Sequence, residues 1–188
     1  MKKMLMINGS PRSNGSSSVI LDAISEKSVE KGYECEKIDL GSLKISHCKA
    51  CMYCKANGKC AIDDDMTALY KKVQDADALV FATPVYFGAE TGLFKNFIDR
   101  LYALVSNKDG VRVVNFGKPK KGIAAVCCGA PDGNMIYHGV MSHLVIVFRA
   151  FGITDVSSGI MPKAAPDTVR DSEFLKDLLD AVDFQLST

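Results

Sequence analysis

Four cysteines crowded into one short stretch are the most chemically distinctive residues of this sequence. They follow the spacing Cys-x2-Cys-x2-Cys-x5-Cys and are Cys48, Cys51, Cys54 and Cys60. Such short spacings allow successive thiolates to converge on one centre, and Gly58 would let the chain turn back before the last of them. Four converging thiolates can ligate a [4Fe–4S] cluster, and tetrahedral zinc is the chemical alternative.

A second candidate site lies near the N-terminus, where small and hydroxyl-bearing residues follow an apolar run. Residues 4–7 are apolar, residues 8–18 are mostly turn formers and hydroxyls, and apolar residues recur at helical spacing from Val19. A strand, a small-residue loop and a helix N-terminus form an anion site, because backbone N–H groups and the helix dipole face the anion. The side chains that can add hydroxyl donors or positive charge are Ser10, Arg12, Ser16, Ser17 and Ser18.

This N-terminal loop matches neither of the two best-known phosphate fingerprints. It lacks the G-x-x-x-x-G-K-[ST] pattern of nucleoside triphosphate sites and the G-x-G-x-x-G pattern of dinucleotide sites. A hydroxyl-rich loop without a lysine suits a terminal monophosphate. The alternative is an ordinary connection whose serines only cap the helix.

A third stretch places aromatic residues at the end of a buried strand. Residues 78–82 are apolar, and Pro84 and Gly88 then bracket Val85, Tyr86 and Phe87. Open α/β sheets bind ligands at this position, outside the carboxyl ends of their strands. An amphipathic pattern over 93–104 predicts a helix, on which we expect Lys95 and Arg100 to form the solvated face.

The elements that position these stretches alternate between strand and helix along the chain. Strands are predicted at 4–7, 34–40, 78–82, 122–128 and 153–160, and helices at 19–29, 66–73, 93–104, 135–151 and 172–186. Buried-type strands alternating with helices indicate a parallel sheet covered on both faces. We therefore predict an α/β fold with a flavodoxin-like, doubly wound sheet of order 2-1-3-4-5. It would form one domain, 1–188, with a long cysteine-bearing loop at about 41–65 and a polar loop at 106–120.

Composition narrows the functional classes. The 188 residues are 47% hydrophobic, and 23 basic less 22 acidic side chains leave a net charge of +1. This balance indicates neither a nucleic-acid nor a membrane partner, and no apolar run approaches the length of a membrane span. Clustered thiols are typical of metal or redox chemistry in a reducing compartment, so a cytoplasmic location is expected. The other cysteines, Cys35, Cys127 and Cys128, are expected to be small core residues.

Three motifs together resemble the NADPH-dependent FMN reductase family, most closely its iron–sulfur flavoproteins. They are GSPRSNGSS at 9–17, CKACMYCKANGKCAIDDDM at 48–66 and TPVYFGAETGLFKNFIDR at 83–100. The resemblance implies FMN at the carboxyl ends of the strands. Its phosphate would bind Ser10, Arg12, Ser16, Ser17 and Ser18, and its isoalloxazine ring would lie against Pro84, Val85, Tyr86, Phe87 and Gly88. Gly129 and its loop would close the other side.

The sequence departs from the family at one point of the phosphate loop. The family often has Gly-Asn-Thr where this chain has Gly15-Ser16-Ser17. Serine keeps the hydroxyl of threonine, but the amide of asparagine is lost as a phosphate ligand.

The resemblance also implies an activity, with alternatives for the cysteine loop. Electrons would pass from NAD(P)H to FMN and on to an unidentified acceptor, in a homodimer or homotetramer for which the apolar stretch 141–151 could form an interface. One alternative is an iron–sulfur flavoprotein that carries electrons without turning over a small substrate. Another is a thiol-based redox sensor. Relatives of this kind also include proteins whose loop holds no cluster and is kept in place by packing or a disulfide.

Overall fold

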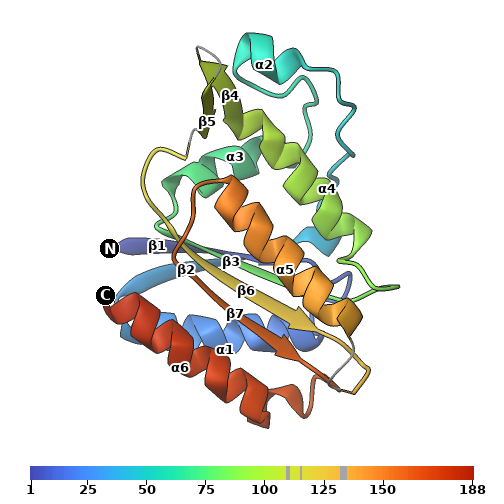
Figure 1. Ribbon diagram of the computed structural model, residues 1–188, viewed down its shortest axis with the longest axis vertical. Coiled ribbons are helices and arrows are strands. Elements are labelled where there is room, and N and C mark those ends of the chain that lie inside the picture. Colours follow the sequence, from blue (N-terminus) through green and yellow to red (C-terminus); the bar gives the residue numbers. More distant parts are fainter. Residues whose placement is uncertain (109–110, 115, 132–134) are drawn as a thin grey trace.

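The computed structural model describes residues 1–108, 111–114, 116–131 and 135–188, and its centre is a five-stranded parallel sheet (Figure 1). The strands are β1 (Lys2–Asn8), β2 (Tyr33–Asp39), β3 (Ala78–Pro84), β6 (Lys121–Cys127) and β7 (Val156–Met161). Their spatial order is β2-β1-β3-β6-β7, and each neighbouring pair is parallel. Counted along the chain within this sheet, the order is 2-1-3-4-5. The predicted α/β fold class and flavodoxin-like topology are confirmed.

Helices cover both faces of the sheet, which explains the nearly continuous apolar runs of its inner strands. On one face lie α1 (Ser16–Glu30) and α6 (Glu173–Ser187), and on the other α3 (Met66–Asp75), α4 (Gly92–Arg100) and α5 (Met135–Ala150) (Figure 1). Each face has its own apolar core. Phe81 of β3 anchors the second core, stacking on Phe148 at 4.4 Å between ring centroids and meeting Phe94 edge-on at 5.3 Å. All five predicted helices are confirmed.

Two segments predicted as loops contain regular structure. Within 106–120, β4 (Val105–Lys108) and β5 (Val111–Val114) form an antiparallel pair in a separate sheet, so the prediction of a polar loop is wrong there. The sequence pattern does not reveal the pairing of Val105 with Val114, because each strand is only four residues long. Within 41–65 lies the short helix α2 (Tyr53–Asn57), next to β4 at the top of Figure 1.

Short 3-10 helices complete the described chain. They are η1 (Leu40–Ser42), η2 (Leu101–Leu104) and η3 (Val169–Asp171). Within the described ranges, no helix has both the length and the apolar character needed to cross a lipid bilayer.

Candidate functional site

The loop that follows β1 is held in place by hydrogen bonds from the end of that strand. Asn8 is fully buried, and its amide nitrogen donates to the Asp39 carboxylate at 2.7 Å. Its amide oxygen accepts from the backbone N–H of Ser10 at 3.0 Å. Gly9 donates its N–H to the Ala82 carbonyl at 2.7 Å. Asn8, which our sequence reasoning did not single out, therefore fixes where the loop leaves the sheet.

Gly9 is required by packing at this exit. A Cβ at Gly9 would lie 2.9 Å from Cδ2 of Phe94, which is fully buried in α4. Because atoms in a well-packed core cannot approach so closely without displacing a neighbour, only glycine lets the loop lie against α4.

The start of α1 provides unpaired backbone donors. Gly15 is its N-cap residue, and no side chain caps the helix. The N–H groups of Ser16 and Ser17 have no acceptor among the described residues. The two serines are 6% and 1% exposed. Helix N-termini with free amides favour anions, so the geometry does not support the alternative in which serines only cap the helix.

Two serines at the loop keep their hydroxyl protons free. Oγ of Ser10 accepts from the backbone N–H of Arg12 at 3.1 Å, and Oγ of Ser18 accepts from Nζ of Lys37 at 3.0 Å. Each hydroxyl can therefore still donate. Arg12 is exposed and adds positive charge. Lys37, a residue of β2 that the sequence analysis missed, pairs with Asp22 at 2.5 Å, so it orients the Ser18 hydroxyl without adding net charge to the loop.

The hydroxyls of Ser16 and Ser17 are already engaged by distant segments. Ser16 donates to the Ala164 carbonyl at 3.1 Å, so its proton is used within the fold. Oγ of Ser17 lies 3.1 Å from Sγ of Cys127, where either atom can donate. The four serines are therefore not equivalent, although the sequence presents them as one run of donors.

The stretch after β3 ends in a tight two-residue turn. Tyr86 and Ala89 exchange backbone hydrogen bonds at 2.9 and 3.1 Å, and the φ angles of Phe87 and Gly88 between them are +51° and +79°. Positive φ at both central residues is typical of a type I′ turn. The turn presents Tyr86, which is 45% exposed, and the fully exposed Phe87. Pro84 and Val85, which precede it, are half-buried.

These two loops lie side by side at one edge of the sheet. β1 and β3 are neighbouring parallel strands, with Asn8 opposite Ala82 at their carboxyl ends. Thr91, the N-cap of α4, donates its hydroxyl to the Gly9 carbonyl at 2.6 Å and so ties the two segments together. Gly129 follows β6 at the same edge and is exposed. The end of its predicted loop, residues 132–133, lies outside the described residues.

The four cysteines of the long loop are free thiols that the structure does not bring together. Cys48 and Cys51 are exposed, and Cys54 and Cys60 are half-buried. Across the described ranges, no three His, Cys, Asp or Glu residues form a group that could hold a metal ion. Ala50 and Met52 have φ of +49° and +58°, so the backbone bends twice between the thiols. In this arrangement the loop does not fit a four-thiolate cluster, which stays a prediction from the sequence.

Arg100 anchors this loop to α4, and the prediction that it lies on a solvated face is wrong. Its side chain is 1% exposed and meets the two Asp64 oxygens at 2.8 and 3.1 Å. It also donates to the carbonyls of Ser46 and Ile62. Lys95, by contrast, pairs with Asp99 on the exposed face, as expected. Burial works to raise the pKa of Asp64, but hydrogen bonds from Arg100 and two backbone amides outweigh it and hold that pKa below its ordinary value.

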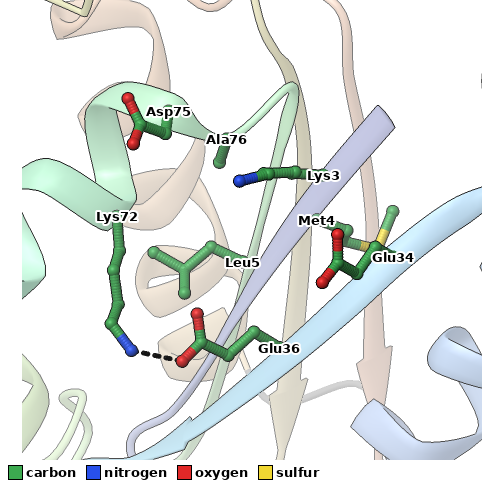
Figure 2. A pocket seen from close by; sticks show the side chains of 8 residues that line it. All are labelled: Lys3, Met4, Leu5, Glu34, Glu36, Lys72, Asp75 and Ala76. Atoms are coloured by element: carbon green, nitrogen blue, oxygen red, sulfur yellow. Dashed lines mark hydrogen bonds and ion pairs between the residues drawn. The ribbon is translucent and has the colours of Figure 1, made fainter. Parts of the chain in front are cut away.

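A small hollow lies away from the loops, between β1, β2 and the end of α3 (Figure 2). Its volume is about 120 Å³, below the size of ordinary ligand pockets. Lys72 and Glu36 form an ion pair across it, and Lys3, Glu34 and Asp75 complete its charged wall (Figure 2). A space this small, crossed by an ion pair, does not suit a cofactor.

Comparison with known proteins decides the family. Residues 2–164 match the family described as NADPH-dependent FMN reductase. The chain belongs to this family. The resemblance drawn from the three motifs, and the prediction of an enzyme of the FMN reductase class, are thereby confirmed.

Sequence relatives agree with this assignment, and a solved structure shares the fold. An iron-sulfur flavoprotein of Archaeoglobus fulgidus is 33% identical over 93% of this chain and 74% of its own length. One of Methanosarcina thermophila is 34% identical over 70% of this chain and 65% of its own length. The chain spans about half the length of other iron-sulfur flavoproteins that it matches. An NAD(P)H:quinone oxidoreductase from Methanothermobacter marburgensis shares the fold, with TM-score 0.77, 18% identity and coverage of 97% and 98% of the two chains.

The Arg100–Asp64 pair is expected to dominate the stability of the long loop. Asp64→Ala leaves the Arg100 charge buried without its partner, so it should lower the free energy of unfolding by about 3 kcal/mol. The matched control Asp99→Ala breaks an exposed pair and should cost no more than about 0.5 kcal/mol. Urea denaturation measures both. Because the pKa of Asp64 is lowered, this stabilisation is present above pH ~4 and is lost as the pH falls. Equal costs for the two variants would contradict the assignment.

The cysteines are expected to fall into two classes of thiol reactivity. Burial raises the pKa of Cys127 to about 11, whereas Cys48 and Cys51 are exposed. Because the thiolate is the nucleophile, iodoacetamide at pH 8 should label Cys48 and Cys51 of the native protein and spare Cys127. Peptide mass spectrometry reads out each site, and labelling of all seven cysteines in denaturant is the control. Rapid labelling of Cys127 in the native protein would contradict the burial of its thiol.

Proposed function

We propose that this protein is an FMN-dependent oxidoreductase that transfers electrons from NAD(P)H through bound FMN to a small-molecule or protein acceptor. The observation that carries the proposal is the pair of unpaired amides, Ser16 and Ser17, at the start of α1. They lie in the loop that Thr91 ties to the segment bearing Tyr86 and Phe87. One edge of the sheet thus offers donors for a phosphate and aromatic surface for a planar ring.

The residues of the phosphate loop suit the cofactor's terminal group. A phosphate dianion only accepts hydrogen bonds, and the loop offers it donors: the amides of Ser16 and Ser17 and the free hydroxyl protons of Ser10 and Ser18. Arg12 adds charge from the exposed side. We assign the phosphate to Ser10, Arg12, Ser16, Ser17 and Ser18. The Ser17 hydroxyl is included because it can still donate when Cys127 acts as the donor in their contact.

The ring would lie against the turn after β3. Pro84, Val85, Tyr86, Phe87 and Gly88 line this edge, and Gly129 borders it from β6. A Cβ at Gly129 would meet nothing within 4 Å, so the space beside it is open. When bound, FMN would supply the two-electron chemistry, while these residues position it and exclude water from one of its faces.

The setting of this activity follows from other features. The seven cysteines are free thiols, which suits the reducing cytoplasm. We propose that residues 1–188 form one FMN-binding domain and that the protein assembles as a homodimer or homotetramer through the apolar stretch 141–151. Ile146, on the outer side of α5, is 59% exposed and would be covered in that assembly.

A second candidate function is supported by the relatives. Proteins of Archaeoglobus fulgidus and Methanosarcina thermophila that this chain resembles are named iron-sulfur flavoproteins. The proposed ligands of a [4Fe–4S] cluster here are Cys48, Cys51, Cys54 and Cys60. Since these thiols are not gathered in the structure, we place the cluster second and route no step of the reaction through it. A thiol-based redox sensor would use the same loop without metal.

The phosphate assignment is tested by comparing FMN with riboflavin, which lacks the phosphate. Arg12→Ala should weaken FMN binding about fivefold, the worth of one hydrogen bond, and leave riboflavin binding unchanged. Arg170→Ala removes an exposed arginine that pairs with Glu26 of α1, outside the proposed interface; it is the matched control and should change neither. Flavin fluorescence titration measures the six affinities of the wild type and the two variants for the two flavins, and NADPH oxidation by the FMN-loaded protein tests the activity. A wild-type protein that binds no FMN would refute the proposed function.

The aromatic turn gives a separate test. Tyr86→Ala removes an aromatic face from the proposed ring site and should lower FMN retention about fivefold, in line with the energy of one aromatic contact. Tyr53→Ala removes a tyrosine of similar exposure from α2 and should retain FMN like the wild type. Gel filtration followed by the flavin-to-protein absorbance ratio measures retention. Unchanged retention and turnover in Tyr86→Ala would remove this residue from the site.

The cluster is tested by purification without oxygen. If the second candidate holds, the protein should carry about four irons per chain, with broad absorption beside the flavin bands. Cys48→Ser should then lose the iron, whereas Cys35→Ser, in β2, should keep it. Flavin bands without iron would leave an FMN reductase whose cysteine loop binds no cluster.

A further inference from the structure

The buried thiol of Cys127 contacts both loops of the proposed FMN site. Cys127 ends β6 and is 4% exposed. Its Sγ lies 3.1 Å from Oγ of Ser17, at the start of α1, and 3.8 Å from the carbonyl oxygen of Thr83, where the aromatic stretch begins. Its own carbonyl accepts the N–H of Val85 at 3.0 Å. One residue thus joins the phosphate loop to the ring loop.

The protonation state of this thiol determines what it can do for Ser17. Because burial raises the pKa of Cys127 to about 11, the thiol keeps its proton at neutral pH and is a donor. The Ser17 hydroxyl oxygen is nearer to it than the Thr83 carbonyl is. When S–H donates to Ser17, the oxygen has its donor and the hydroxyl proton is free to turn toward an acceptor. A phosphate is such an acceptor.

We propose that Cys127 is a positioning residue that holds the Ser17 hydroxyl as a hydrogen-bond donor to the phosphate of the bound cofactor. This rests on the proposed function, since it names a support of that same site. The role differs from that of the neighbouring Cys128, whose Sγ lies 3.8 Å from the carbonyls of Ala130 and Met161. Cys128 is equally buried, so it is a matched control for the loss of a core thiol.

The test separates phosphate recognition from general packing. Affinities for FMN and riboflavin are measured by fluorescence titration on Cys127→Ala, Cys127→Ser and Cys128→Ala. Cys127→Ala should weaken FMN binding about fivefold, the worth of one hydrogen bond, without changing riboflavin binding. Cys127→Ser keeps a donor at this position and should restore the preference for FMN. Cys128→Ala should leave the ratio of the two affinities at its wild-type value.

Ser17→Ala tests the same hydroxyl independently, so the proposal can still be tested if Cys127→Ala does not fold. It should show the same selective loss of FMN affinity, and adding Cys127→Ala to it should cause no further change in the ratio. If the wild type binds FMN but Cys127→Ala leaves the ratio of FMN affinity to riboflavin affinity unchanged, the positioning role is overturned. This includes the case in which both affinities weaken equally. Failure of the wild type itself to bind FMN would instead refute the proposed function, so the two failures are distinguishable.

Discussion

The parallel pairing of β1 with β3 is the constraint on which the candidate site depends. Because both strands run in the same direction, the loops that follow them emerge at the same edge, with Asn8 opposite Ala82. In an order of 2-1-3, the connections from these two strands turn to opposite faces, the arrangement in which open α/β sheets bind ligands. The hydrogen bond from Thr91 to Gly9 and the close packing of Gly9 on Phe94 hold the loop after β1 against the start of α4.

Helix α4 links this edge to the cysteine loop. Its N-cap, Thr91, contacts the phosphate loop, and its last residue, Arg100, holds the loop that carries the four thiols. Nine helical residues at 1.5 Å each separate the two ends by about 13 Å. The aromatic turn and the thiols are therefore held at opposite ends of one rigid element within a chain.

The sequence was sufficient for the five strands of the parallel sheet, the five long helices and the two loops, because these depend on short-range patterns; it did not reveal α2, β4 or β5. Five apolar runs, helical periodicity and turn residues identify the strands, the helices and the edge where Ser10 and Tyr86 lie. Contacts between distant residues were not predictable. The helical pattern places Arg100 on a solvated face, because no neighbouring residue in the sequence indicates that Asp64, 36 positions earlier, pairs with it. The contact of Ser17 with Cys127 spans 110 positions. For the cysteines, the spacing shows that four thiols can converge on one centre, but it does not determine the conformation that the loop adopts.

The departure from the family's Gly-Asn-Thr pattern is resolved by the same long-range contacts. Ser16 stands where the family often has asparagine, and its hydroxyl donates to the Ala164 carbonyl, 148 positions away. The side chain at this position therefore serves the connection between the loop and the segment after β7. What Ser16 can still offer an anion is its backbone N–H, which any residue would supply. In the proposed phosphate site, anion recognition would then rest on two amides and on the hydroxyls that keep their protons. Which hydroxyls these are depends on their contacts with Arg12, Lys37 and Cys127. The number of serines in the sequence does not show it.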